Sequence, residues 1–244
     1  MSNKPSISQL IQAAEQGDAA AQYKLARAYA YGDGVTQDRD KEVILYRKAA
    51  ELGNPDAMYK LAFFHSVGFC GVQEDKTKAN DLYRKAAAGF HQAAEQGNAD
   101  AQLSLCECYM KGRGVAKNIQ QAIMWLRKAA KQGNCEAMYW LGSLYDEGKE
   151  VAQDHEQAAK WWLKASAQGD TDAQFSLGEL YRLGKGRPQD NKMAYIWYSV
   201  STIDNNEAVR ARDDLERLLT PADLIDAQTL TQRYIKRRIS EETQ

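Results

Sequence analysis

Five glycines recur along this chain of 244 residues at separations of 36, 44, 36 and 36 residues. After each glycine, an apolar run begins with Ala and continues with Leu four residues later. A period of this length is typical of repeat proteins, in which a single unit cannot bury its own apolar face and stacks on its neighbours. The spacing therefore predicts an array of about five repeats. The five glycines are Gly17, Gly53, Gly97, Gly133 and Gly169.

Each period has room for two helices. The first, helix A, carries Ala, Leu and usually Tyr at positions i, i+4 and i+8, which share one helical face, as in Ala137, Leu141 and Tyr145. A glycine follows every helix A. Helices often end at a residue in the left-handed conformation, and glycine adopts it easily because it has no Cβ atom. These glycines are Gly32, Gly68, Gly112, Gly148 and Gly184.

The second helix of each repeat, helix B, begins after an Asp or Asn. Such a side chain accepts hydrogen bonds from the free N–H groups of the first turn, which is worth roughly 1 kcal/mol. The predicted caps are Asp38, Asp75, Asn118, Asp154 and Asp190. Helix B carries aromatic side chains in register, which we expect to be buried. The main column is Tyr46, Tyr83, Trp162 and Tyr198, interrupted by Leu126.

The spacing of 44 residues has a simple explanation. One extra residue enters the loop at Phe69–Cys70, and seven enter helix B between Ala87 and Ala93. Because seven residues make almost two turns, the helical face rotates by only about 20°. This helix B should therefore be longer by roughly 10 Å and keep its register, so that it forms a ridge beside its shorter neighbours.

Both ends of the array are predicted to be capping helices, because repeat arrays need polar ends to stay soluble. Thr220–Pro221 supplies a cap and a proline at the first helical position for the last helix. We expect a single domain over residues 6–240. It consists of an N-terminal helix at 6–16, repeats at about 18–53, 54–97, 98–133, 134–169 and 170–205, and C-terminal helices at 206–240.

Composition excludes several classes of function. Lys plus Arg number 32 and Asp plus Glu 33, a net charge of -1, so the chain has no general attraction for nucleic acid. No secretory signal is visible, and no apolar run approaches the roughly 20 residues of a membrane span. The four cysteines occupy no constant place in the repeat, which argues against a disulfide framework. We expect a cytoplasmic protein with reduced thiols and no membrane partner.

Catalytic and metal-binding motifs are missing from the sequence. It contains no Ser-x-x-Lys, no His-Glu-x-x-His and no phosphate-binding Gly-x-x-x-x-Gly-Lys. Cys106 and Cys108 stand two apart on a helix and so point about 200° away from each other, which does not suit a metal site. His65 takes the place of a helix A tyrosine and is expected in the core. We expect no catalytic residue, no bound metal and no cofactor.

The repeat pattern, most complete over residues 137–169, resembles that of the Sel-one-like repeat (SLR) family, relatives of the tetratricopeptide repeats. The resemblance implies an all-α fold, a right-handed α-solenoid superhelix of about five helix-turn-helix repeats with N- and C-terminal capping helices. It also implies a non-catalytic adaptor or scaffold that binds proteins, with helix A lining the concave side. The regular cysteine pattern of family members linked to β-lactams does not occur here.

Residues that the repeat does not need are the candidates for binding a peptide or a protein partner. They lie on helix A, opposite the Ala-Leu-Tyr stripe, and Trp140 is the most notable because an exposed indole is a typical interface anchor. The predicted protein-binding residues are Lys24, Arg27, Lys60, Phe63, Glu107, Trp140, Ser143, Glu147, Ser176 and Glu179. Their charge changes from basic in the first repeats to acidic in the later ones, which would set the orientation of a partner. The column Tyr23, Tyr59, Leu103, Tyr139 and Phe175 is interpreted as a stacking spine.

Other readings remain open at this point. The resemblance also allows a bacterial immunity-type protein that neutralises a cognate toxin, or a weak β-lactam hydrolase. The long helix B offers a surface for self-association, although a monomer is favoured.

Overall fold

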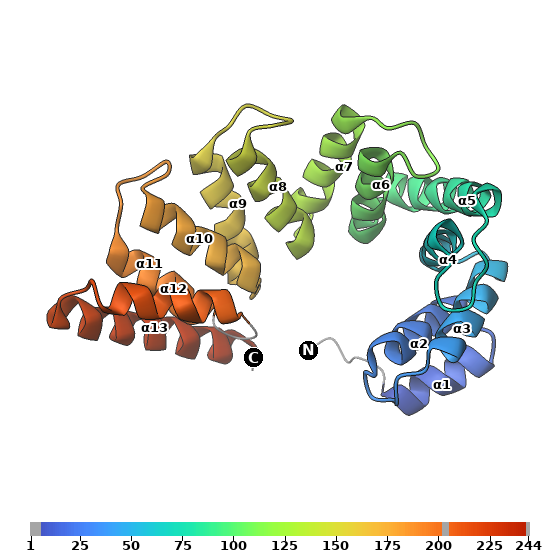
Figure 1. Cartoon of the computed structure of the whole chain (residues 1–244), viewed down its shortest axis with the longest axis horizontal. Coiled ribbons are helices and arrows are strands. Elements are labelled where there is room, and N and C mark those ends of the chain that lie inside the picture. Colours follow the sequence, from blue (N-terminus) through green and yellow to red (C-terminus); the bar gives the residue numbers. More distant parts are fainter. Residues whose placement is uncertain (1–5, 202–204, 243–244) are drawn as a thin grey trace. The chain divides into compact units, whose positions relative to one another are not determined.

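The computed structural model describes residues 6–201 and 205–242, and in these ranges the chain forms thirteen helices and no strand (Figure 1). The all-helical class predicted from the sequence is confirmed. The helices are α1 (Ile7–Glu15), α2 (Ala19–Tyr31), α3 (Arg39–Glu51), α4 (Pro55–Val67), α5 (Lys76–Glu95), α6 (Ala99–Lys111), α7 (Ile119–Lys131), α8 (Cys135–Glu147), α9 (His155–Ala167), α10 (Thr171–Leu183), α11 (Asn191–Val200), α12 (Asn206–Glu216) and α13 (Pro221–Glu242).

The chain divides into two compact units, residues 1–125 (unit 1) and 126–244 (unit 2), with the boundary inside α7. In unit 1, successive helices from α1 to α6 pack on one another, and in unit 2 the same holds from α8 to α12. Each unit therefore has the neighbour-on-neighbour packing of a repeat protein. We predicted that residues 6–240 form one domain with the repeat boundaries given above, and this stays a prediction. The junction between the fifth repeat and the C-terminal helices includes residues 202–204, which lie outside the described residues.

The helix ends follow the sequence signals. Each helix A ends at its glycine in the left-handed conformation, from φ +75° at Gly32 to φ +65° at Gly184. Each helix B starts at its predicted Asp or Asn, whose side chain accepts a hydrogen bond from the backbone N–H three residues later. The local chemistry of the loops thus fixes where both helices of a repeat begin and end.

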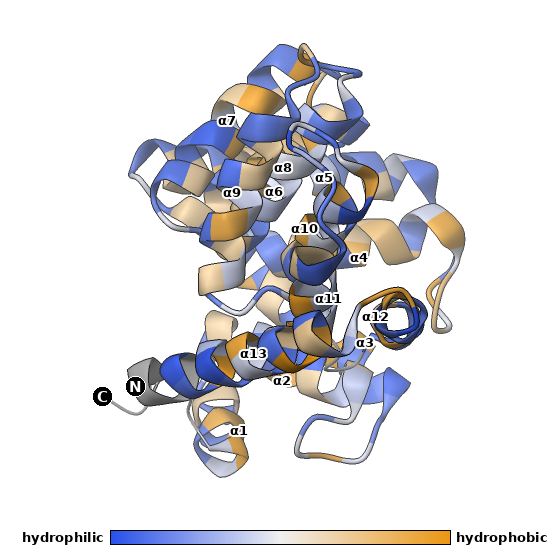
Figure 2. Cartoon of the chain, turned by 90° about the vertical axis from the view of Figure 1, so that its left-hand side faces the viewer, coloured by the Kyte–Doolittle hydropathy of each residue, from blue (hydrophilic) through white to orange (hydrophobic). Residues whose placement is uncertain are grey.

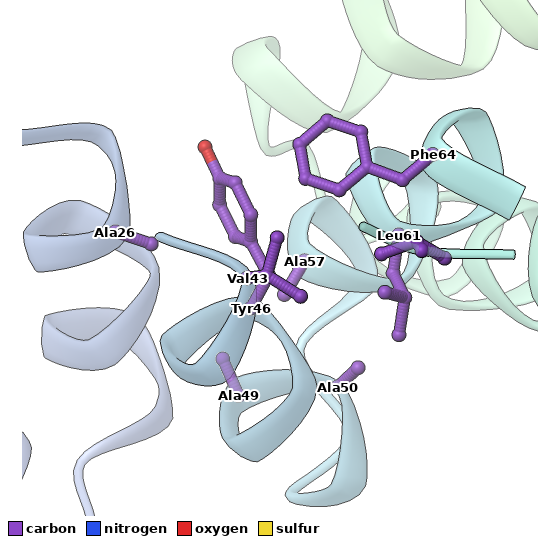
Figure 3. Close-up of a cluster of buried hydrophobic side chains, with 9 residues drawn as sticks. Ala26, Val43, Tyr46, Ala49, Ala50, Ala57, Leu61 and Phe64 are labelled. Atoms are coloured by element: carbon purple, nitrogen blue, oxygen red, sulfur yellow. The ribbon is translucent and has the colours of Figure 1, made fainter. Parts of the chain in front are cut away.

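Aromatic side chains of helix B fill the space between the helices A of successive repeats. In unit 1, Tyr46 of α3 lies between α2 and α4 and is 2 % exposed, with its ring centroid 5.9 Å from that of Phe64 (Figure 3). Ala26 of α2 and Leu61 of α4 belong to the same buried cluster. The predicted column of buried helix B side chains is confirmed, since Tyr46, Tyr83, Leu126, Trp162 and Tyr198 are all at most 5 % exposed.

Small residues on helix A make this close packing possible. A Cβ on Gly142 would lie 2.5 Å from Trp162 Nε1, and one on Gly178 would lie 2.5 Å from Tyr198 Cε1. The aromatic ring of helix B therefore rests directly on the backbone of helix A. Trp162 Nε1 also donates a hydrogen bond of 3.2 Å to the carbonyl of Tyr139, which satisfies the polar edge of the buried indole.

The helix that carries the seven extra residues, α5, is 20 residues long, against 13 for α3 and α9. Its extra turns extend past the neighbouring loop. Gly186 packs against His155, the first residue of α9, whereas the equivalent Gly114 packs against Tyr83, the eighth residue of α5. The predicted lengthening is therefore confirmed, and two turns of α5 lie beyond the loop that would otherwise cover its start.

The C-terminal helix α13 covers the end of unit 2. Its Tyr234 packs edge-on against Trp197 of α11 at 5.7 Å and donates a hydrogen bond of 3.3 Å to the carbonyl of Ser166 in α9. Lys192 forms an ion pair of 2.9 Å with Asp226 across the same contact. Hydrophilic residues are frequent on the rest of α13 (Figure 2), as expected for a helix that ends a repeat array.

Replacing Gly114 by Ala tests the close approach of this loop to α5. Both Gly114 and Gly97 are left-handed, so Ala costs roughly 1–2 kcal/mol at either position. At Gly114 the new Cβ would also collide with the carbonyl oxygen of Tyr83, whereas at Gly97 it meets nothing within 4 Å. We expect Gly114→Ala to cost about 1–3 kcal/mol more than Gly97→Ala. Urea unfolding followed by circular dichroism measures the difference, and equal losses would contradict the close contact between the loop and α5.

Candidate protein-binding clefts

Unit 1 contains a cleft of about 350 Å³ between α4 and α6, which we call the first cleft. These are the helices A of two successive repeats, and α5 lies between them in the chain. Tyr59 and Phe63 of α4 form part of its wall. Phe90, from the seven-residue insertion in α5, also reaches it and lies 6.1 Å from the Tyr59 ring. The longer helix B thus contributes a buried aromatic side chain to the wall of the cleft.

Arg113 organises the first cleft. Its guanidinium donates a hydrogen bond of 2.8 Å to the Tyr59 hydroxyl and lies over the rings of Tyr59, Phe63 and Tyr83 at 5.2–5.9 Å. An arginine stacked on aromatic rings gains cation–π attraction beyond its charge. The same group lies 3.6 Å from Glu107, which Lys111 also contacts at 2.6 Å.

The two acidic groups of the first cleft differ in their electrostatics. Burial acts to raise the pKa of Glu107, but the hydrogen bond and charge of Lys111, together with Tyr59 and Arg113, outweigh it and hold that pKa below the ordinary value. Burial, and then the nearby charge of Asp100, raise the pKa of Asp56 in spite of the opposing charge of Lys60. Negative charge is thus compensated at Glu107 and disfavoured at Asp56.

Unit 2 contains a second cleft, of about 290 Å³, between α8 and α10. Tyr139 and Phe175 occupy its wall at the repeat positions that Tyr59 holds in the first cleft. Its ionisable groups are mostly acidic, in contrast to the first cleft. They are Asp146, Glu147, Glu179 and Lys185.

Glu179 is the most constrained acidic group of the second cleft. Its carboxylate accepts hydrogen bonds from Arg182, the shorter at 2.7 Å, and from the Tyr198 hydroxyl. Burial again acts to raise its pKa, but these bonds and the charge of Arg182 lower it below the ordinary value. Glu107 and Glu179 hold equivalent positions two repeats apart, and each is paired with a basic side chain, Lys111 or Arg182, and linked to a tyrosine hydroxyl.

The structure brings most of the predicted binding residues into these clefts. Lys60, Phe63 and Glu107 line the first cleft, and Ser143, Glu147, Ser176 and Glu179 line the second. The other three lie outside both. Lys24 and Arg27 are exposed on α2, and Trp140 is 50 % exposed on α8, with its Nε1 donating to Glu136 at 3.4 Å. Trp140 is therefore a surface residue and not part of the core.

Sequence reasoning missed Arg113, Lys111 and Phe90. Phe90 lies seven residues after Tyr83, and this spacing places both side chains on one face of α5. The spacing could therefore have indicated that Phe90 faces the same side as Tyr83. Arg113 stands in a loop position that holds Asp33, Lys149 and Lys185 in other repeats, and no local pattern shows that it reaches the preceding repeat. The residues interpreted as a stacking spine also line the clefts, since Tyr23, Tyr59, Tyr139 and Phe175 do so.

Comparison with known proteins identifies the repeat. The family model described as Sel1 repeat matches five segments. They are residues 19–54, 55–89, 99–134, 135–170 and 171–201. The chain belongs to the Sel1 repeat family. The resemblance and the five-repeat organisation predicted from the sequence are therefore confirmed.

Curated relatives of this Sel1 repeat chain include proteins named as regulators. The "Exopolysaccharide production negative regulator" of Rhizobium meliloti is 34 % identical over 128 residues, which cover 48 % of this chain and 46 % of the relative. "Chitin synthase regulatory factor 1" of Schizosaccharomyces pombe is 37 % identical over 92 residues, which cover 37 % of this chain and 18 % of the relative. The Sel1 repeat chain thus spans less than half of the length of these two relatives.

Two solved structures share the fold over most of this chain. The uropathogenic Escherichia coli protein c5321, a protective antigen displaying an SLR fold, is 35 % identical with a TM-score of 0.69, covering 96 % of this chain and 49 % of its own. A Sel1 repeat protein from Oxalobacter formigenes is 27 % identical with a TM-score of 0.61, and the match covers 90 % of this chain and 89 % of that protein.

Two cysteines and one histidine are buried in the core. Burial raises the pKa of the thiols of Cys106 and Cys108 to about 12, which keeps them protonated and unreactive. His65 is 6 % exposed, as expected for a core residue, and its Nδ1 lies 3.1 Å from the carbonyl of Gln73. Over the described residues, no group of three or more His, Cys, Asp or Glu could hold a metal ion, and no helix has both the length and the apolar character to cross a bilayer.

The pairing of Glu107 predicts a change of stability with pH. The pKa of Glu107 is lower in the folded protein than the ordinary glutamate pKa of 4.5. The contribution of its carboxylate to the free energy of unfolding is therefore fully present above pH 4.5 and is lost as the pH falls through the pKa of the folded state. We expect Glu107→Gln to be less stable than the parent at pH 7 and the difference in the free energy of unfolding to narrow as the pH falls below 4.5. Urea unfolding midpoints at pH 7 and pH 3.5 measure this. Glu147→Gln, at an exposed pair with Lys149, is the matched control and should change little. A difference at pH 3.5 as large as that at pH 7 would contradict the assignment.

Proposed function

We propose that this protein is a non-catalytic adaptor that binds a peptide or protein segment on the helix A faces of its repeats. Proteins built from Sel1 repeats serve as protein-interaction adaptors and regulators. The observation that carries the proposal for this chain is the pair of clefts between successive helices A, which are lined by seven of the ten residues that the repeat itself does not need.

The shape and lining of the clefts favour binding over catalysis. Both are open, and their walls combine aromatic side chains with charged groups, the composition typical of binding hot spots. Lys111 holds Glu107 in place and Arg182 holds Glu179, which suits a fixed recognition surface better than an exchange of protons with a substrate. We propose a reducing, cytoplasmic setting because all four cysteines are free and none is fully exposed.

Trp140 extends the proposed binding surface beyond the second cleft. Its ring is half exposed and lies 5.8 Å from that of Tyr139, a wall residue of that cleft. A large, exposed and rigid indole next to a cleft is the kind of residue that dominates the energy of an interface. The equivalent position in the first cleft is Lys60, so the two units present different chemistry at the same place in the repeat.

Substitutions at these positions should separate binding from folding. We expect Trp140→Ala to weaken partner binding by about 2 kcal/mol, or roughly 30-fold, and Lys60→Glu to weaken it as well. Neither should move the melting temperature by more than about 2 °C, because neither side chain is buried. Affinity capture from native lysate with quantitative mass spectrometry compares each variant with the parent, and Lys48→Glu, on the exposed surface of α3, is the control.

Two results would count against the proposal. Equal losses of melting temperature and of capture would show that Trp140 and Lys60 support the fold. Hydrolysis of nitrocefin by the purified chain, abolished by one point substitution, would show an enzyme in place of an adaptor.

A further inference from the structure

The two clefts differ in charge although they occupy equivalent places in the repeats. The first cleft contains three cationic groups, Lys60, Lys111 and Arg113, against Asp56 and Glu107. The second contains three acidic groups and Lys185. A cleft focuses the field of the charges that line it, so the sign of its charge selects among possible partners.

The positive charge of the first cleft is partly free to act on a partner. Glu107 already uses its carboxylate on Lys111 and Arg113, at 2.6 and 3.6 Å. Lys60 forms no ion pair with the residues that the structure describes, although Asp56 lies close enough to feel its charge. A carboxylate arriving beside Lys60 would give this ammonium an ion pair.

An apolar surface lies next to this cationic group. Phe63 stands three residues after Lys60 on α4 and so faces the same side of the helix. Phe63 is 38 % exposed, and the guanidinium carbon of Arg113 lies 5.9 Å from the centre of its ring. An apolar side chain of a partner would cover the exposed part of this ring and exclude water from the neighbouring ion pair, which strengthens that pair.

We propose that the first cleft binds an acidic peptide segment, in which a carboxylate side chain on Lys60 stands next to an aromatic or aliphatic side chain on Phe63. The proposal rests on the proposed function and names the chemistry of the partner. A nucleic acid is the less suitable occupant. Its binding draws its strength from several phosphates neutralised at once, whereas this chain has a net charge of -1 and the cleft offers three cations, two of them already paired with Glu107.

Short labelled peptides test this preference with the full chain. Fluorescence anisotropy would compare fluorescein-Gly-Asp-Phe-Asp-Gly with the isosteric Gly-Asn-Phe-Asn-Gly and the basic Gly-Lys-Phe-Lys-Gly. We expect the acidic peptide to bind at least about 10-fold more tightly than the neutral one, and the difference to shrink as the salt concentration rises.

Variants assign the binding to this cleft. Lys60→Met should reduce the affinity for the acidic peptide about 10-fold and leave the affinity for the neutral peptide unchanged, because only the ion pair is lost. Phe63→Ser should weaken the binding of both the acidic and the neutral peptide. Lys48→Met is the matched control, an exposed lysine on α3 outside the cleft, and it should bind like the parent. Melting temperatures of all variants confirm that they fold.

Other outcomes would overturn the inference. Equal binding of the acidic and neutral peptides, tighter binding of the basic peptide, or no effect of Lys60→Met would each exclude an acidic partner for this cleft. Tighter binding of a single-stranded uridylate oligonucleotide than of the acidic peptide would point to nucleic acid. Any of these results leaves the adaptor function standing as long as Trp140→Ala still weakens capture from lysate, so the two proposals fail separately.

Discussion

The close approach of helix A to helix B within each repeat is the constraint on which the other features depend. The ring of Trp162 lies on Gly142 and that of Tyr198 on Gly178, so a larger residue at either glycine would push the two helices apart. In unit 1, Ala26 takes part in the cluster around Tyr46. The uncovered side of helix A forms much of the walls of the clefts, together with Phe90 of α5 and Trp162 of α9.

The sequence was sufficient for features that depend on neighbouring residues. Capping side chains and left-handed glycines act within one turn, so the roles of Asp38 and Gly32 follow from their places in the repeat. The same holds for the longer α5, because a helix that gains seven residues keeps its face. The face of helix A that carries Lys60 and Phe63 followed from helical geometry alone.

Features that depend on contacts between repeats could not be obtained in this way. Arg113 lies in the loop of one repeat and donates to Tyr59 in the preceding one, 54 positions earlier in the chain. Sequence reasoning assigned Glu107 to partner binding but could not show that Tyr59 of the preceding repeat bonds to its carboxylate. It also assigned Tyr59 to packing alone, whereas that side chain packs and lines a cleft. Periodicity shows which positions are special but not which residues they meet.

The length of α5 implies a rule for how the reach of such a protein can change during evolution. An added segment of seven residues returns the helix to within about 20° of its former orientation, so Tyr83 and Phe90 share one face and both stay buried. A segment of five would turn everything before it by about 140° and expose the aromatic column. Helices of this kind can therefore lengthen only in discrete steps, and each permitted step adds one more side chain to the wall that a guest molecule meets.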